Sequence, residues 1–76
     1  MNKKEFITEF SGRLKLECFL CGKSKEEIAG VAGISATTLH SYIRGSSSPS
    51  AVSLAGLCEA LGVSSDYLLF GGCDGD

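Results

Sequence analysis

The chain has 76 residues, of which 43% are hydrophobic and 21% are charged, and its formal net charge is −2. This length allows one small domain, and charged residues interrupt the apolar stretches too often for a signal peptide or a membrane span. We therefore expect a cytoplasmic protein without a membrane partner. All seven Lys and Arg fall in residues 1–50 beside five acids, whereas residues 51–76 carry four acids and no Lys or Arg. A domain polarised in this way can present a basic face although it is acidic overall.

The first predicted helix runs from Lys3 to Cys21 and ends at Gly22, in the role of a helix C-cap. Its core-facing residues recur at helical spacing and are Ile7, Phe10, Leu14, Cys18 and Cys21. Another apolar group lies on the opposite side of this helix and comprises Leu16, Phe19 and Leu20. The sequence leaves two interpretations open: scattered surface residues, or the cover of a dimer contact or a second domain.

Residues 24–45 carry the most informative pattern, because one helical segment ends there and another begins after a three-residue joint. The earlier helix starts at Ser24, with Glu27 three residues later as in a capping box, and ends at Gly33. Its apolar positions are Ile28, Val31 and Ala32, and the small residue Ala29 stands where crossing helices must approach closely. This pattern predicts the first half of a helix-turn-helix.

The later helix of this pair runs from Ala36 to about Arg44, is capped by Ser35 and is ended by Gly45. Its inward residues are Leu39 and Tyr42. A helix-turn-helix presents its second helix to the major groove of DNA, so the pair predicts a DNA-binding function.

Two further helices are predicted after a serine-rich loop. Ser48 or Ser50 caps the fourth helix, and Gly62 ends it. Its apolar residues are Val52, Leu54, Leu57, Cys58 and Leu61. A short fifth helix spans Ser64 to Leu69. The expected organisation is therefore an all-α, compact five-helix bundle over residues 1–70, followed by a disordered tail over residues 71–76.

Neither a metal site nor a catalytic site is predicted. Cys18 and Cys21 form a C-x2-C pair, but structural zinc sites usually need a second ligand cluster, and His40 is the only histidine. We interpret both thiols as core residues of one helix face. The carboxylates are dispersed and the glycines form no phosphate-binding loop, so we expect no enzyme activity and no cofactor.

The order and spacing of these residues resemble the phage-repressor and Cro-like (Xre-type) helix-turn-helix domains over about residues 10–71. The resemblance rests on Arg13-Leu14, Glu26-Glu27-Ile28-Ala29, Gly33-Ile34-Ser35, Thr38-Leu39, Arg44-Gly45, Ala60-Leu61-Gly62-Val63 and Asp66-Tyr67-Leu68-Leu69. It implies a lambda-repressor-like fold, binding to double-stranded DNA as a homodimer, and transcription regulation as a repressor.

The resemblance also implies which residues meet DNA. The base-facing set would be Ala36, Thr37, Thr38, His40 and Ser41. The phosphate-binding set would be Lys25, Arg44, Ser46, Ser47 and Ser48. Three positions depart from the family pattern. Lys25 replaces a common glutamine, Ala36 replaces a long polar residue, and Ile43 replaces a common acidic residue, a change that we interpret as structural. None of the base-facing residues is a bidentate reader such as Arg or Gln, so we expect modest discrimination at each base pair.

An alternative function belongs to another class. The same fold can serve as a protein-interaction module, for instance an antitoxin-like partner that masks a toxin. The weak basic charge and the apolar outer side of the first helix favour this alternative. A homodimer could form through that outer side or through the fifth helix near residues 67–70, and a second domain could also cover these surfaces.

Overall fold

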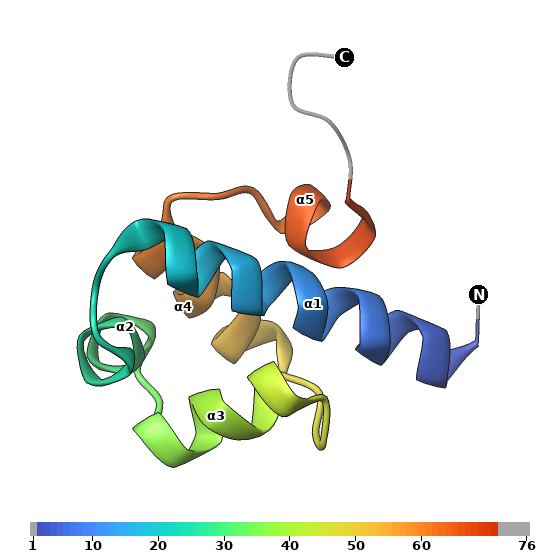
Figure 1. The fold of residues 1–76 in the computed structure, drawn as a ribbon, viewed down its shortest axis with the longest axis horizontal. Helices are drawn as coiled ribbons and strands as arrows, with labels where there is room; N and C mark the ends of the chain where they lie inside the picture. The colour runs from blue at the N-terminus through green and yellow to red at the C-terminus, as the bar shows by residue number, and fades with distance from the viewer. Residues whose placement is uncertain (1, 72–76) are drawn as a thin grey trace.

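A computed structural model describes residues 2–71 as a bundle of five helices (Figure 1). The helices are α1 Lys3–Cys21, α2 Lys25–Ala32, α3 Ala36–Arg44, α4 Ala51–Leu61 and α5 Ser65–Phe70. α1 crosses the middle of the molecule, with α5 on one side of it and α3 on the other (Figure 1). The predicted all-α, five-helix fold is confirmed. The predicted tail begins at Gly71, and residues 72–76 lie outside the described part of the chain.

Each helix starts at a side chain that accepts a hydrogen bond from a backbone amide of its first turn. Asn2 and Ser24 form capping boxes with Glu5 and Glu27, respectively. Single serine caps begin the remaining helices, at Ser35, Ser50 and Ser64. The cap of α4 is therefore Ser50 and not Ser48, which resolves the choice that the sequence left open. These caps satisfy amides that have no partner inside the helix.

A single core lies between the helices. Its ten buried residues are Phe10, Leu14, Ile28, Ala29, Ala32, Leu39, Tyr42, Leu57, Ala60 and Leu68. Every helix contributes at least one of them, so all five helices pack on one shared core. Within residues 2–71, no helix is both long enough and apolar enough to cross a membrane.

Two valines expected on inner helix faces are instead exposed, Val31 at 55% and Val52 at 82%. At 100° per residue, Ile28, Ala32 and Ala29 fill an arc of about 100° on α2, and Val31 lies about 60° outside it. Val52 lies about 140° around α4 from the buried Leu57. A hydrophobic residue type was therefore not enough to predict burial. The angular position of each residue on its helix decides whether its side chain faces the core.

α2 and α4 cross at very close range, and Gly56 makes this possible. A Cβ atom added at Gly56 would lie 2.9 Å from the Cα and the carbonyl carbon of Ala32, and closer still to its carbonyl oxygen. Real Cβ atoms do not approach backbone this closely. The sequence assigned a close approach within the helix-turn-helix to Ala29, which is buried as expected. It did not single out Gly56, which makes the crossing of α2 and α4 possible.

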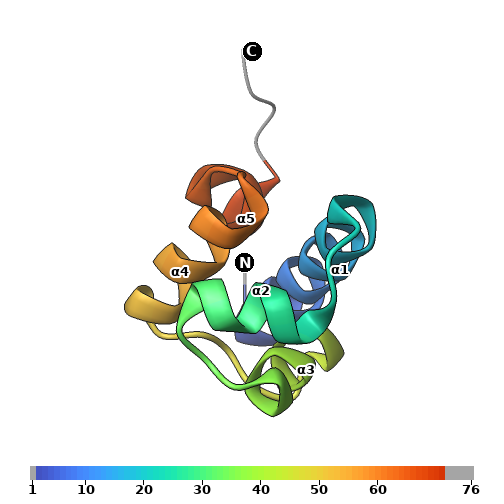
Figure 2. The ribbon, with the colours of Figure 1, turned by 90° about the vertical axis from the view of Figure 1, so that its left-hand side faces the viewer.

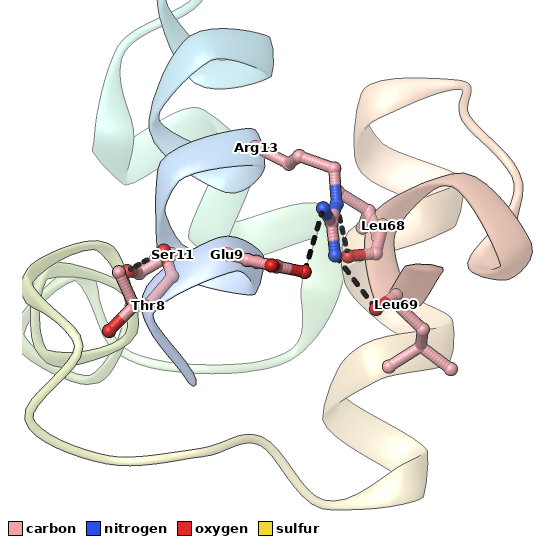
Figure 3. A network of polar contacts seen from close by, with 6 residues as sticks. All are labelled: Thr8, Glu9, Ser11, Arg13, Leu68 and Leu69. Atoms are coloured by element: carbon pink, nitrogen blue, oxygen red, sulfur yellow. Dashed lines mark hydrogen bonds and ion pairs between the residues drawn. The ribbon is translucent and has the colours of Figure 1, made fainter. Parts of the chain in front are cut away.

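Arg13 of α1 holds the C-terminal end of α5 (Figure 3). Its Nε donates to the carbonyl oxygen of Leu68 at 2.9 Å, and its Nη2 donates to that of Leu69 at 2.7 Å. Nη1 lies 3.9 Å from Oε1 of Glu9, one turn earlier on α1. A guanidinium satisfies several acceptors at once, so one side chain caps the last carbonyls of a short helix.

Candidate nucleic-acid interface

The joint between α2 and α3 is a tight turn built on Gly33. This residue has φ 78°, in the left-handed region that favours glycine. The amide of Ile34 then donates to the carbonyl oxygen of Ala29 at 3.0 Å, which ends α2. Ser35, the next residue, accepts from the amide of Thr38 at 3.0 Å, which begins α3. The turn therefore fixes the start of α3 relative to α2, as a helix-turn-helix requires.

α3 lies at one edge of the molecule, with one side free of the other helices (Figures 1 and 2). The exposed residues of this helix are Thr37, His40 and Arg44. At 100° per residue they fall within an arc of about 60°, so they form one surface along the helix. Ala36 and Ser41 are partly buried and flank that surface on its two sides.

Thr38, the fifth member of the predicted base-facing set, is engaged in the helix cap. Its Oγ1 accepts from the Oγ of Ser35 at 2.8 Å, and its side chain is partly buried. It lies about 100° around α3 from Thr37, on the side away from His40. The structure thus gives Thr38 a local role at the start of α3, while the other four residues of the set lie on or beside the exposed surface.

The loop after α3 continues the same edge of the molecule. Gly45 has φ 77° and lies against α1, since a Cβ there would come within 3.3 Å of Ser11 Oγ. The amide and the hydroxyl of Ser46 both donate to the carbonyl oxygen of Ser41, at 3.0 and 3.1 Å. Ser47 and Ser48 follow and are exposed. The three predicted phosphate-binding serines are therefore consecutive and are separated from Arg44 only by Gly45.

Lys25 lines a hollow between α1, the start of α2 and the last turn of α3. The hollow has a volume of about 390 Å³ and is lined by Lys15, Cys18, Phe19, Lys23, Lys25 and Ile43. Three lysines, from α1, from the joint before α2 and from the first turn of α2, thus line one hollow beside the last turn of α3. Lys15 and Lys23 were absent from the predicted site. Their positions come from separate segments, and no local pattern in the sequence indicated that these would meet.

Cys18 in this hollow is a neutral thiol at physiological pH. Burial raises its pKa from 9.0 to about 11, and the neighbouring Cys21 adds to the increase. Lys25 acts in the opposite direction but does not compensate for the burial. The thiolate is the nucleophilic and metal-binding form of cysteine, so a neutral Cys18 supplies neither activity. The hollow therefore offers the positive charge of its lysines and an apolar surface.

The comparison with known families agrees with this geometry. A family model described as helix-turn-helix matches residues 14–68. The chain belongs to this helix-turn-helix family, which is of the Xre and lambda-repressor-like type. The match begins and ends at Leu14 and Leu68, two fully buried core residues. No curated protein and no solved structure matched the chain.

Membership of the helix-turn-helix family assigns the general function. Domains of this family bind double-stranded DNA and regulate transcription, so the chain is a DNA-binding domain of a transcription regulator. α3 is the second helix of the motif, and such a helix enters the major groove with its N-terminal residues toward the bases.

Proposed function

We propose that this helix-turn-helix protein binds a specific operator through α3 and represses transcription there. The observation that carries the proposal is the shared exposed surface of Thr37, His40 and Arg44 on the second helix of the motif. The resemblance to phage repressors supports repression, in which a bound domain occupies DNA that the transcription machinery needs.

The base contacts would come from the N-terminal part of α3. The Thr37 hydroxyl and a ring nitrogen of His40 can donate to or accept from base edges, and the Thr37 methyl suits a thymine methyl. Ala36 and Ser41 flank these two residues, so they would contact bases at the edges of the groove. Thr38 could still donate its hydroxyl hydrogen to DNA, because its bond to Ser35 uses the hydroxyl only as an acceptor.

Phosphate contacts would come from two groups of side chains beside α3. Arg44 and the adjacent serines 46–48 form one group, at the C-terminal end of the helix. Lys25, joined in its hollow by Lys15 and Lys23, forms the other group. A phosphate contact positions the protein without reading sequence, and each one adds to the salt dependence of binding.

A single domain of this size reaches few base pairs, so a homodimer on a near-palindromic operator is part of the proposal. Its half-sites would lie about one helical turn apart, at roughly 34–36 Å, as for other helix-turn-helix dimers.

The decisive experiment selects duplexes that the purified chain retains from a random library at moderate salt. We expect an enriched motif with two-fold symmetry. Thr37→Ala or His40→Ala should relax the preference at defined positions of each half-site, because these changes remove base contacts. No enrichment by the folded protein would overturn the proposal and favour the protein-interaction module, such as an antitoxin-like partner.

The phosphate contacts need a separate measurement, because they act on all sequences alike. Arg44→Ala and Lys25→Ala should each weaken binding to every duplex and reduce the salt slope by about one. Lys3→Ala is the matched control, since it removes the same charge from the end of α1 farthest from the hollow. Equal losses for Lys3→Ala and Lys25→Ala would contradict the assignment of Lys25.

A further inference from the structure

One side of α1 carries a row of exposed side chains that can contact an anion. The row consists of Lys4, Thr8 and Lys15, which fall within an arc of about 40° at 100° per residue. Figure 3 shows Thr8 on one side of α1, whereas Glu9 lies on the side that faces α5. We call Lys4, Thr8 and Lys15 the basic row of α1.

The basic row lies beside the C-terminal part of α3. Ser11, which is about 40° around α1 from the middle of the row, lies against the end of α3, because a Cβ at Gly45 would come within 3.3 Å of Ser11 Oγ. One turn later on α1, Lys15 lines the hollow together with Ile43 of α3. The row therefore runs beside the end of α3 and the loop that follows it.

The acids of α1 lie on other sides of the helix. Glu5, Glu9 and Glu17 are about 80°, 120° and 160° from the middle of the basic row. No Asp or Glu occurs from residue 28 to residue 58, a segment that includes all of α3 and the loop after it. Among residues 2–71, the structure shows an ion pair only between Arg13 and Glu9, so neither lysine of the row is paired with an acid of the domain.

The backbone of DNA is the partner that this positive face fits, and this step rests on the proposed entry of α3 into the major groove. The groove is about 12 Å wide, so a phosphate strand borders it about 6 Å from its middle. Figure 2 shows α1 above α3 and displaced to one side. Axes of packed helices are about 8–10 Å apart, which places α1 toward one of these strands. Each lysine carries its charge on a flexible four-carbon stem that can extend to a phosphate.

We propose that the basic row of α1 binds the phosphate backbone of one DNA strand beside the recognition helix. Lys4 and Lys15 each contact a phosphate as point charges, and the Thr8 hydroxyl donates to a phosphate between them. Ser11 Oγ donates to the carbonyl oxygen of Thr8 at 3.1 Å, a bond that uses the backbone of Thr8 and leaves its hydroxyl available. The row is about 16 Å long, and phosphates follow one another about every 3.4 Å along the axis of a strand, so the row can meet more than one.

The basic row extends the phosphate contacts beyond those already assigned to Lys25 and Arg44. Lys15 belongs to both the hollow and the row, whereas Lys4 and Thr8 lie outside the hollow. Phosphate contacts carry no sequence information, so the row would strengthen binding to every duplex alike. A local positive face of this kind lets a domain with a formal net charge of −2 bind a polyanion.

Fluorescence anisotropy of a labelled random-sequence duplex tests the row without an operator. The logarithm of the binding constant falls with the logarithm of the salt concentration, with a slope of about −0.9 for each neutralised phosphate. Lys4→Ala should therefore reduce the slope by about 0.9 per bound chain, and the double variant of Lys4 and Lys15 by about twice as much. Thr8→Val should weaken binding about 10-fold at an unchanged slope, because it removes a hydrogen bond but no charge. Circular dichroism checks that each variant is folded.

Lys3→Ala is the matched control for Lys4→Ala. Both lysines are exposed in the first turn of α1, and the two variants have the same net charge, but Lys3 lies about 120° from the middle of the row. Lys3→Ala should therefore leave the salt slope nearly unchanged. Equal changes for the two variants would show that only the overall charge acts, and would overturn the proposal. An unchanged slope for Lys4→Ala would overturn it as well.

A gain of binding provides the opposite test. Thr8→Lys adds a charge within the row and should steepen the salt slope by about 0.9. Leu16→Lys adds the same charge at a residue that is 49% exposed and lies about 100° from the middle of the row. It should leave the slope nearly unchanged, so equal gains for the two variants would contradict the assignment.

These measurements separate the basic row from the proposed operator. If Lys4→Ala changes the slope but no motif is enriched from the random library, the row stands and the operator fails. If a motif is enriched but Lys4→Ala leaves the slope unchanged, the operator stands and the row fails. A folded chain that binds no duplex at low salt would overturn the row together with the operator.

Discussion

Replacing Gly56 with alanine tests a very close contact between the helix-turn-helix and the rest of the fold. Gly56 lies in α4, against the backbone of Ala32 in the last turn of α2. An added methyl group cannot be accommodated by a rotamer change, because the atoms that it meets belong to the backbone. The two helices would have to separate.

The expected cost follows from the distances. The carbonyl carbon and Cα of Ala32 lie 2.9 Å from the new Cβ, whereas an ordinary van der Waals contact begins at 3.4 Å. Overpacking of this kind costs about 1–3 kcal/mol, and a backbone obstacle favours the upper end. Alanine returns about 1 kcal/mol in helix propensity. We expect a net loss of about 2 kcal/mol in the free energy of unfolding, or roughly 10–15 °C in Tm.

Urea and thermal denaturation of Gly56→Ala and Gly30→Ala form the matched pair. Gly30 is exposed within α2, and a Cβ there meets nothing within 4 Å. Gly30→Ala should therefore stabilise the fold by about 0.5–1 kcal/mol, since only the backbone entropy and propensity terms change. A loss of stability for Gly56→Ala together with a gain for Gly30→Ala would support the close crossing of α2 and α4. If both variants gain stability, the crossing is looser than described and the reasoning fails.

Three other changes have defined outcomes. Arg13→Met removes both hydrogen bonds to the end of α5 and should lower the free energy of unfolding in urea by about 1–3 kcal/mol; an unchanged midpoint would show that α5 is held by packing alone. The free energy of unfolding should fall as pH rises from about 9 to about 11, because the folded state keeps the Cys18 proton that the unfolded chain loses. Cys18→Ala should flatten this region of the plot of unfolding free energy against pH. An identical plot for the variant would contradict the raised pKa. Ser50→Ala should cost about 1 kcal/mol of stability through loss of the α4 cap, whereas Ser48→Ala should be neutral; equal effects in chemical denaturation would place the cap elsewhere.

The helices and their limits were predictable because the signals that set them are local. Ser24, Ser35 and Ser64 cap the helices that the sequence assigned to them, and Gly33 and Gly45 end α2 and α3 as predicted. Such signals act within four residues, so one sequence is enough to find them. α5 was predicted to end at Leu69 but continues through Phe70, a difference of one residue at a frayed end.

The arrangement of side chains between distant segments could not be predicted in this way. Gly56 is an ordinary helix residue until α2 crosses it, and Arg13 binds carbonyls 55 and 56 positions later in the chain. The gathering of Lys15 and Lys23 beside Lys25 likewise exists only in the folded chain. The bond between Thr38 and Ser35 differs from these cases, because the two residues are three positions apart and both lie at the start of α3. It is a local feature of the helix cap.

The attachment of α5 has a consequence for the motions of the domain. This helix has six residues, and Leu68 is its only fully buried side chain, so few apolar contacts resist its release. The two hydrogen bonds from Arg13 are therefore a large part of what holds α5, and we expect their loss to make a local opening of α5 easier. Among the helices, α5 should exchange its amide hydrogens first, through a local opening well below the free energy of global unfolding. The recognition helix would remain folded during that opening, because its own supports are α1 and α2.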